Sequence, residues 1–443
     1  MSRWKKHLCL LAAALCAIAM TALAEAPLLV PEFSDFIDGG AGTVEAFSAV
    51  RPDVPVEIAQ GGSAPDISRL VQEMTLQDGS MDVLWLMMQT RGYAAVRDRG
   101  YCAGLESSEA LRQYVDGMYP AIADGLWQEE KLCAIPVKIL LRTAAFNRDA
   151  MEALGLGEDD LPGSVSELLD FIAGWDSDAP VALTEYDPTT TRRLLFCLIR
   201  DAQESWCAAQ GKPLTYDDPT FIALLEKLDA AMPALRASQG MEGRLSLLRP
   251  FVDPTPSLWN QTANTQPLLL ARVPDEAPHI KAYVDLYAVN PYSGQQEAAV
   301  AFLECAVRSA ANAPLMDILL HPDRNDLIES AAYRGEMPDL LSLLARQEEA
   351  LRNPDLSGDE RLQWELSAED TRARMAQLEA VRWVTSPEAL AQWRMFAQHI
   401  VVPMFSGDTD ELNSLTDRYL DGQLSPAQFA REAEGVLWMI QQE

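Results

Sequence analysis

Short apolar segments alternate with longer amphipathic segments along most of the chain. Residues 81–87 (MDVLWLM) are nearly all apolar, which is typical of a strand buried on both faces of a sheet. Residues 28–30 (LLV) and 54–58 (VPVEI) predict two further strands, and segments with helical spacing begin near residues 43 and 93. This alternation of strands and helices predicts a parallel α/β layer.

A second unit with the same alternation follows. Residues 140–146 and 181–184 predict strands, and residues 134–137 are extended. Ser164 and Glu167 have the spacing of a capping box at the start of a helix. Further helices are predicted over residues 148–154, 192–207, 221–232 and 295–308, and a last strand over residues 283–289 (YVDLYAV). From about residue 326 onward the pattern is helical and charged.

The first 24 residues predict a secretory signal peptide. Basic residues precede an apolar segment at residues 8–20, and Ala22 and Ala24 stand at the two positions that a signal peptidase reads. The apolar segment is shorter than the roughly 20 residues of a spanning helix, which argues against an uncleaved anchor. A lipoprotein signal at Cys16 is a further alternative, but Leu15 is too large for that cleavage. We therefore expect an exported protein that is located either in the periplasm or outside the cell, including the cell surface.

Size and charge narrow the class of protein. The mature chain is longer than a chain that folds around one hydrophobic core usually is, so two lobes are expected. The chain has 35 basic and 66 acidic residues, and loss of the three basic residues of the signal peptide leaves 32 against 66, a net charge of −34. Because nucleic-acid binding requires a basic surface, no nucleic-acid partner is expected.

Catalytic and metal-binding motifs are absent from the sequence. It contains no phosphate-binding loop, no dinucleotide fingerprint, no H-E-x-x-H and no G-x-S-x-G. The cysteines beyond the signal peptide are scattered without a C-x-x-C pair, so we expect no zinc site. We expect them to be buried free thiols, and one incidental disulfide is the alternative. These cysteines are Cys102, Cys133, Cys197, Cys207 and Cys305. We expect no enzyme activity, no catalytic residue, no metal and no cofactor.

Five segments resemble, in order along the chain, the extracellular solute-binding proteins of family 1, the maltose-binding-protein-like class of ABC importers. Residues 82–85 (DVLW) are similar to a strand of that family, and residues 134–150 (AIPV, then AFNRDA) to its "glPv…yYNkdlf" stretch. The other three are residues 154–169, residues 289–303 and residues 419–426 (YLDGQLSP). Together these matches are typical of the family, although no single one is specific.

The resemblance implies an α/β, two-lobed periplasmic-binding-protein-like fold of the class II type, with an extended helical C-terminal part. The chain would cross between lobes near Pro136, near Tyr283 and near residue 325. The implied division is a signal peptide at 1–24, an N-terminal lobe of residues 25–137 plus 284–324, and a C-terminal lobe of residues 138–283 plus 325–443. Ligand would bind in the cleft, because open α/β sheets bind solutes beyond the carboxyl ends of their strands.

Candidate ligand-binding residues follow the predicted strands. Asp35 and Gln89 follow strands of the first lobe, and Lys138 stands at the first crossing. Tyr186 and Asp187 follow the strand at residues 181–184. Trp259 lies in a loop rich in Pro and Asn, where its ring is suited to stack on a sugar face. For each of these residues, a structural role in a cap, a turn or the core is the alternative.

The function that the sequence favours is capture of a small polar solute, such as an oligosaccharide, and its delivery to an ABC permease by a monomeric protein. One alternative is a secreted glycan-acting hydrolase, because a carboxylate pair can be hidden among the many acidic residues. The other is a sensor or scaffold whose C-terminal helices engage a membrane partner.

Overall fold

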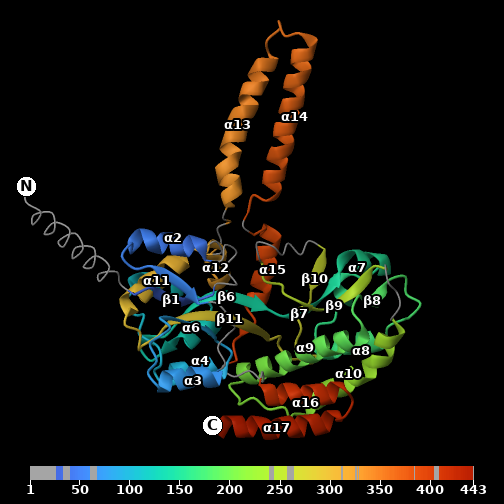
Figure 1. The fold of residues 1–443 in the computed structure, drawn as a ribbon. Coiled ribbons are helices and arrows are strands. Elements are labelled where there is room, and N and C mark those ends of the chain that lie inside the picture. The colour runs from blue at the N-terminus through green and yellow to red at the C-terminus, as the bar shows by residue number, and fades with distance from the viewer. Residues whose placement is uncertain are drawn as a thin grey trace, which may run out of the picture.

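The chain forms two α/β lobes and a projecting helical hairpin (Figure 1). The computed structural model describes residues 26–32, 40–59, 67–238, 244–256, 264–310, 313–324, 327, 329–383, 385–403 and 409–442. Buried apolar residues form two main clusters. One contains residues between 28 and 141, between 280 and 320 and between 390 and 402, and the other contains residues between 144 and 270 and between 412 and 440. Two separate cores confirm the two-lobed α/β prediction.

The first lobe is built around strand β11 (Ile280–Val289), which lies between three other strands. It pairs antiparallel with β3 (Val83–Met87) and β6 (Ile135–Leu141), and parallel with the short β12 (Ile400–Val401). Strands β1 (Leu28–Pro31) and β2 (Val56–Ala59) form a parallel pair beside β3. A small hairpin, β4 (Trp127–Gln128) and β5 (Lys131–Leu132), completes the strands. The helices are α2 (Ala41–Val50), α3 (Ile67–Thr75), α4 (Arg91–Asp98), α5 (Glu109–Val115), α6 (Pro120–Leu126), α11 (Gln296–Ser309), α12 (Ala313–Leu320) and α15 (Pro387–Ala397).

The second lobe has a four-stranded sheet in the order β10, β7, β9, β8. These strands are β7 (Thr143–Asn147), β8 (Ala182–Thr184), β9 (Ser246–Val252) and β10 (Thr265–Pro267). Its helices are α7 (Arg148–Leu154), the 3-10 turn η1 (Glu158–Asp160), α8 (Val165–Ala173), α9 (Pro188–Ala209), α10 (Pro219–Ala237), α16 (Asp410–Leu420) and α17 (Pro426–Gln442). The predicted cap of α8 is present: the Ser164 hydroxyl accepts the Glu167 N–H at 3.1 Å, although the Glu167 carboxylate accepts the N–H of Gly163 rather than that of Ser164.

The first crossing lies at Arg142, a few residues beyond the expected one near Pro136. The single strand expected over residues 140–146 is divided there into the end of β6 and the start of β7. Leu141 belongs to the first core and Ala144 to the second. Pro136 does not interrupt β6, because β6 pairs only with β11 and an edge strand tolerates the missing N–H donor.

The last crossing also lies later than expected. Helix α15 presents Trp393 and Phe396, both completely buried, to the first core. Buried residues join the second core again only at Leu412 on α16. The segment expected to enter the second lobe near residue 325 therefore first contributes to the first lobe, because the apolar face of α15 packs there.

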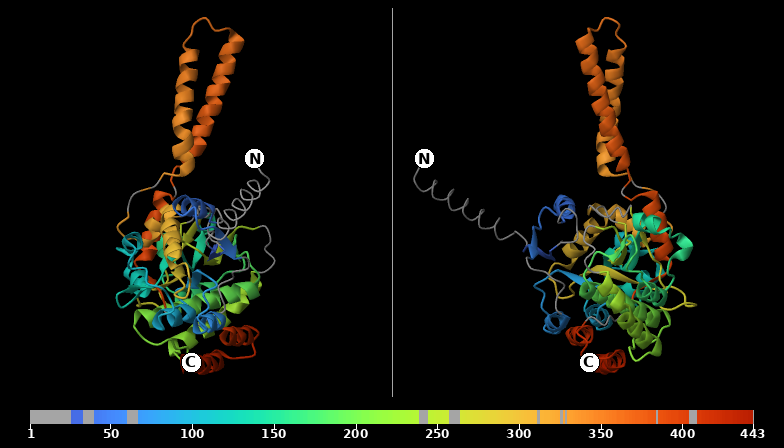
Figure 2. Two further views of the ribbon diagram at one scale, coloured as in Figure 1. Left: turned by 60° about the vertical axis from the view of Figure 1, so that its left-hand side comes forward. Right: turned by 90° about the vertical axis from the view of Figure 1, so that its right-hand side faces the viewer.

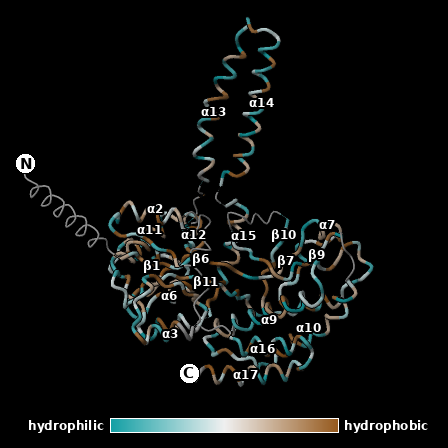
Figure 3. Tube along the Cα trace, viewed as in Figure 1, coloured by the Kyte–Doolittle hydropathy of each residue, from teal (hydrophilic) through white to brown (hydrophobic). Residues whose placement is uncertain are grey.

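Helices α13 (Ala331–Leu351) and α14 (Gly358–Ala380) form an antiparallel hairpin that projects away from both lobes (Figures 1 and 2). Its less exposed residues recur with spacings of three and four, as in a coiled coil. The residues that follow this spacing are Met337, Leu340, Leu344, Gln347 and Leu351 on α13, and Ala368, Thr371, Met375 and Leu378 on α14. Figure 3 shows hydrophilic and hydrophobic residues mixed along both helices. The predicted helical C-terminal part is thus largely this hairpin.

Candidate functional site

The carboxyl ends of the parallel strands in the second lobe lie at the edge of the sheet that faces the first lobe. Strands β8 and β9 run parallel, with Thr184 opposite Leu248. Strand β7 runs antiparallel to β9, and its first residue, Thr143, lies opposite Val252 at the end of β9. Because β7 begins directly after Arg142, the ends of β8 and β9 point toward the crossing.

The corresponding end of the first sheet faces the same crossing. Asp285 on β11 lies opposite Met87, the last residue of β3, and also opposite Lys138 on β6. These three residues form a row across the sheet, and the chain runs from Lys138 into Arg142 and the second lobe. Strand ends of two separate cores therefore meet at one place, as a ligand site between two lobes requires.

Charged side chains concentrate at this meeting of strand ends. The Lys138 ammonium lies 4.0 Å from the Asp285 carboxylate, and both side chains are partly accessible. After the end of β9, the Asp253 carboxylate accepts the N–H groups of Leu141 at 3.3 Å and Thr255 at 2.9 Å. Burial raises the pKa of the Asp253 carboxyl. At the crossing, the Asp285 carboxylate thus lies close to the Lys138 ammonium, and the Asp253 carboxylate accepts hydrogen bonds from the backbone.

Arg142 itself is held by aromatic rings. Its guanidinium carbon lies 4.0 Å from the ring centroid of Tyr283 and 4.9 Å from that of Phe251. These rings come from β11 and β9, one from each lobe. On the second lobe, the Arg249 guanidinium also approaches the Glu185 carboxylate at 4.0 Å, and both side chains are exposed by more than 40%. Arg249 and Glu185 thus extend the polar lining outward from the crossing.

The structure gives the predicted ligand residues different surroundings. Lys138 lies within β6 opposite Asp285, and Tyr186 follows the end of β8. Part of each side chain is accessible, and Tyr186 is 39% exposed. Gln89 is buried, and its side-chain oxygen accepts the Val284 N–H at 3.1 Å. Asp35 and Trp259 lie outside the described residues.

Asp187 caps helix α9. Its carboxylate accepts the N–H groups of Thr189 and Thr190 and the Thr190 hydroxyl, and this hydroxyl holds the pKa of the Asp187 carboxyl below its usual value. Pro188 at the first helical position and the two threonines after it were the sequence signal for this role. Ligand contact by Gln89 or Asp187 would have to use polar atoms other than those already engaged.

Sequence reasoning missed four of the charged groups at this place: Arg142, Arg249, Asp253 and Asp285. A signal was present for two of them, because Arg142 and Asp285 interrupt otherwise apolar strands, where a charge requires a polar neighbour. Arg249 lies within β9, and Asp253 follows the end of that strand. Neither residue has a local pattern that distinguishes it from a turn residue.

A buried ionic network joins the lobes next to the crossing. The Lys281 ammonium on β11 contacts the carboxylates of Asp201, at 3.3 Å, and Glu204, both on α9. The Tyr283 hydroxyl donates to Asp201 at 2.8 Å, and the Tyr216 hydroxyl donates to Glu204 at 2.9 Å. Burial by itself lowers the pKa of Lys281, but the two carboxylates outweigh it and hold this pKa above its usual value. This network fastens α9 of the second lobe to the sheet of the first.

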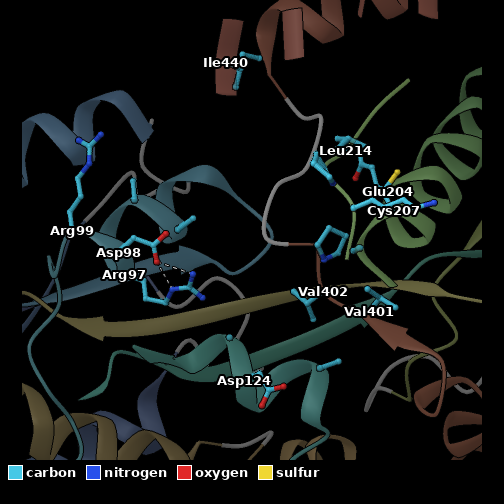
Figure 4. Close-up of a pocket in the computed structure, with 18 residues that line it drawn as sticks. Arg97, Asp98, Arg99, Asp124, Glu204, Cys207, Leu214, Val401, Val402 and Ile440 are labelled. Carbon is cyan, nitrogen blue, oxygen red and sulfur yellow. Dashed lines mark hydrogen bonds and ion pairs between the residues drawn. The ribbon is translucent and has the colours of Figure 1, made fainter. Parts of the chain in front are cut away.

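A separate pocket of about 770 Å³ opens near the other end of α9 (Figure 4). Arg97, Asp98 and Asp124 of the first lobe face Cys207 and Leu214 of the second across it. Asp98 forms an ion pair with Arg97 at 2.8 Å. Glu204 lines this pocket and also belongs to the ionic network, so the pocket lies beside that network, toward the C-terminal end of α9.

No group of three or more His, Cys, Asp or Glu side chains among the described residues is arranged to hold a metal ion. None of the helices in the described part of the chain is long and apolar enough to cross a membrane.

Comparison with known proteins shows which solved structures share this fold. No family model and no curated protein matches the sequence. Among solved structures, an ABC substrate-binding protein of Listeria monocytogenes in complex with cycloalternan matches over 94% of this chain and 98% of its own, with a TM-score of 0.57 and 14% identity. An ABC transporter solute-binding protein of Agrobacterium radiobacter with ribitol gives a TM-score of 0.55, 14% identity and coverage of 94% and 100%.

The third comparison agrees. A maltose-bound protein of T. maritima matches with a TM-score of 0.53, 13% identity and coverage of 94% of this chain and 99% of its own. The chain has the two-lobed fold of ABC substrate-binding proteins. The resemblance drawn from the sequence is thus confirmed at the level of the fold, over nearly the full length of both partners in each comparison.

Proposed function

We propose that this protein is an exported, monomeric, non-enzymatic solute-binding protein that captures a sugar or an oligosaccharide between its lobes and delivers it to an ABC permease. One observation carries the proposal: the strand ends of two separate cores meet at Arg142, with Lys138 and Asp285 on one side and Tyr186 on the other. Closure of the lobes around such a site would enclose a ligand and exclude water.

The chemistry of the lining supports a hydroxyl-rich ligand. Carboxylates such as Asp285 accept hydrogen bonds from hydroxyls, the Lys138 ammonium donates them, and the half-exposed Tyr186 offers a ring face. The similar structures named above contain cycloalternan, ribitol and maltose, which all carry many hydroxyl groups. A ligand of this class needs several directional contacts and no fixed charge.

The proposal is tested by calorimetry on the chain from residue 25 onward. Maltotetraose, a cyclic glucan and ribitol are the probes, and an amino acid mixture and spermidine are the controls, because spermidine reports nonspecific attraction to an acidic protein. Saturable binding of a carbohydrate, with no release of reducing sugar on long incubation, supports the proposal. Turnover of a glycan would instead support the hydrolase alternative, and binding of the controls alone would contradict the proposed ligand class.

Export and the monomeric state belong to the same proposal. Mass spectrometry of the protein recovered outside the cytoplasm should give Glu25 as the first residue. Retention of Met1, or a lipid on Cys16, contradicts cleavage after Ala24. Light scattering on the purified protein should give the mass of a single chain at micromolar concentration.

The hairpin of α13 and α14 favours one second candidate, the sensor or scaffold function. A pair of helices that projects from the body offers a surface separate from the ligand site (Figure 2). Replacing residues 331–380 with a short Gly-Ser linker distinguishes the candidates in cells. Transport that survives this deletion, while a ligand-dependent response is lost, supports the sensor function.

A further inference from the structure

Two cysteines lie side by side in the first core. Cys102 follows α4 and Cys133 follows β5, and both are completely buried. Backbone hydrogen bonds hold their segments together, because Leu105 donates to the Leu132 carbonyl at 2.9 Å and Cys133 donates to the Leu126 carbonyl at 2.9 Å. The two thiols lie within hydrogen-bonding reach of each other. The fold therefore brings together two sulfur atoms that are 31 positions apart in the sequence.

The two thiols are not equivalent. The hydrogen bond that Cys102 donates lowers the pKa of the Cys133 thiol, and Lys131 and Arg97 act in the same direction. The same hydrogen bond raises the pKa of the Cys102 thiol, as does burial. Cys133 is thus the thiol that becomes the nucleophilic thiolate first, and Cys102 is placed to follow it.

We propose that Cys102 and Cys133 form a disulfide bond in the exported protein, an inference that rests on the export part of the proposed function. Exported proteins meet an oxidising environment in which adjacent thiols become disulfides. The oxidant is the disulfide of a thiol oxidoreductase or of a small molecule such as glutathione disulfide.

The reaction balances as two exchange steps. The Cys133 thiolate attacks one sulfur of the oxidant, a mixed disulfide forms, and the first thiolate of the oxidant leaves. Cys102 then loses its proton to solvent, its sulfur attacks that of Cys133, and the second thiolate of the oxidant leaves. Two protein thiols are oxidised and one oxidant disulfide is reduced. Because both sulfurs are completely buried in the folded protein, the oxidant reaches them while the first core is still partly open, with the two cysteines already side by side.

The bond would close a loop that carries α5, α6 and the hairpin of β4 and β5. Constraint of this loop in the unfolded chain stabilises the folded lobe. From general values for loops of this length, the oxidised protein should melt about 5–10 °C above the reduced one. The same loop contributes Ala121, Asp124 and Gly125 to the pocket of Figure 4, so its rigidity also sets the shape of that pocket.

The test is thiol counting by intact mass after alkylation in denaturant without reductant. The chain from residue 25 onward contains five cysteines, so the oxidised protein should take up three alkyl groups. Trypsin should release residues 100–112 linked to residues 132–138, a product that disappears on reduction. The double variant Cys102→Ser, Cys133→Ser should also take up three groups, and Cys305→Ser is the matched control that should take up two.

The experiment is run on two preparations. One is recovered after export, and the other is made without residues 1–24, reduced, and refolded with reduced and oxidised glutathione. If the refolded protein contains the bond while no protein is exported, the proposed export fails and the cysteine pairing stands. Five alkylated thiols in the refolded protein, or a bond between other cysteines, overturns the inference whether or not the protein is exported.

Discussion

The body and the hairpin are stabilised in different ways. Strand β11 is buried along almost its whole length and is central to a core that draws on residues from several distant parts of the chain. The hairpin has only a narrow seam between two helices that are adjacent in sequence, and two of its five buried residues, Gln347 and Thr371, are polar. Local pairing of helices is enough to build a projecting arm, whereas the lobes need contacts over long sequence distances.

Surface ion pairs add little to the hairpin. Arg372 contacts Glu348 at 2.9 Å and Arg374 contacts Glu336 at 2.7 Å, but each of these side chains is close to half exposed. Such pairs typically contribute between 0 and 1 kcal/mol. A more specific contact is made in the seam, where the Gln347 amide donates to the Ser367 hydroxyl at 2.8 Å. We therefore expect the hairpin to unfold separately from the body.

The largest effect on the body should come from Lys281→Met. This change removes the Lys281 ammonium from the buried carboxylates of Asp201 and Glu204. Glu204 keeps an ion pair with Arg200 at 3.7 Å. Breaking one partner of a buried ion pair typically costs about 3–5 kcal/mol, which urea unfolding of the body should register. Lys212→Met is the control, because Lys212 is exposed, and loss of its contact with the Trp206 ring should change stability by no more than about 1 kcal/mol. Equal stability of the two variants would contradict the role of the network.

The next effect should be confined to the hairpin. Ala368 is completely buried in the seam, so Ala368→Asp places a charge between α13 and α14. A buried unpaired charge in a thin seam should cost about 2 kcal/mol or more and melt the hairpin. Far-ultraviolet circular dichroism should show lost helix while the main melting transition stays in place. Ala373→Asp, at an exposed position of α14, is the matched control. A lower melting temperature of the body would show that the two regions are coupled.

These contrasts also explain how far the sequence could predict the structure. Many helices and strands of the lobes were predictable because their periodic patterns are local, as for α7, α8 and α11, whereas β9 and α12 were not predicted. The break at Arg142 was not predicted, because residues 140–146 have the length of a single strand and Arg142 alone does not show that the chain enters the other lobe there. The projection of the hairpin depends on where α15 docks, which no local pattern records.

The site was predictable only in part for a similar reason. The expected crossing near Pro136 identified Lys138, which lies within β6 opposite Asp285, and the strand at residues 181–184 identified Tyr186, which follows β8. The sequence could not separate them from Gln89, since the partner of Gln89, Val284, is 195 positions away. The network of Lys281 with Asp201 and Glu204 likewise joins residues that are about 80 positions apart.

Within the body, substitution of Tyr186 should weaken ligand binding, whereas substitution of Gln89 should lower stability. Tyr186→Ala removes a half-exposed ring at the site and should weaken binding of a carbohydrate by about 5- to 150-fold, with little change in melting temperature. Gln89→Leu leaves the Val284 N–H unpaired and should cost about 1–3 kcal/mol of stability. Calorimetry and thermal melting of both variants check this. A destabilised Tyr186→Ala with unchanged affinity would move Tyr186 from the site to the core.

The smallest effect concerns the pH dependence of the body. Burial raises the pKa of the Asp253 carboxyl in the folded state. Its contribution to stability is therefore fully present below the unfolded pKa and is lost as the pH rises through the folded pKa. The Asp253→Asn amide can still accept from Leu141 but does not titrate. On going from about pH 4 to pH 7, the wild type should lose stability relative to this variant, by about 1 kcal/mol or less.

Urea unfolding at both pH values measures this difference, with Asp178→Asn, an exposed position, as the control. We expect no contribution from the hairpin, because Asp253 accepts hydrogen bonds from Leu141 and Thr255 at the crossing. The same pH dependence should therefore persist when residues 331–380 are deleted. A variant that loses stability in parallel with the wild type would mean that the Asp253 carboxylate is accessible to water, and that the crossing is open there rather than closed over this carboxyl group.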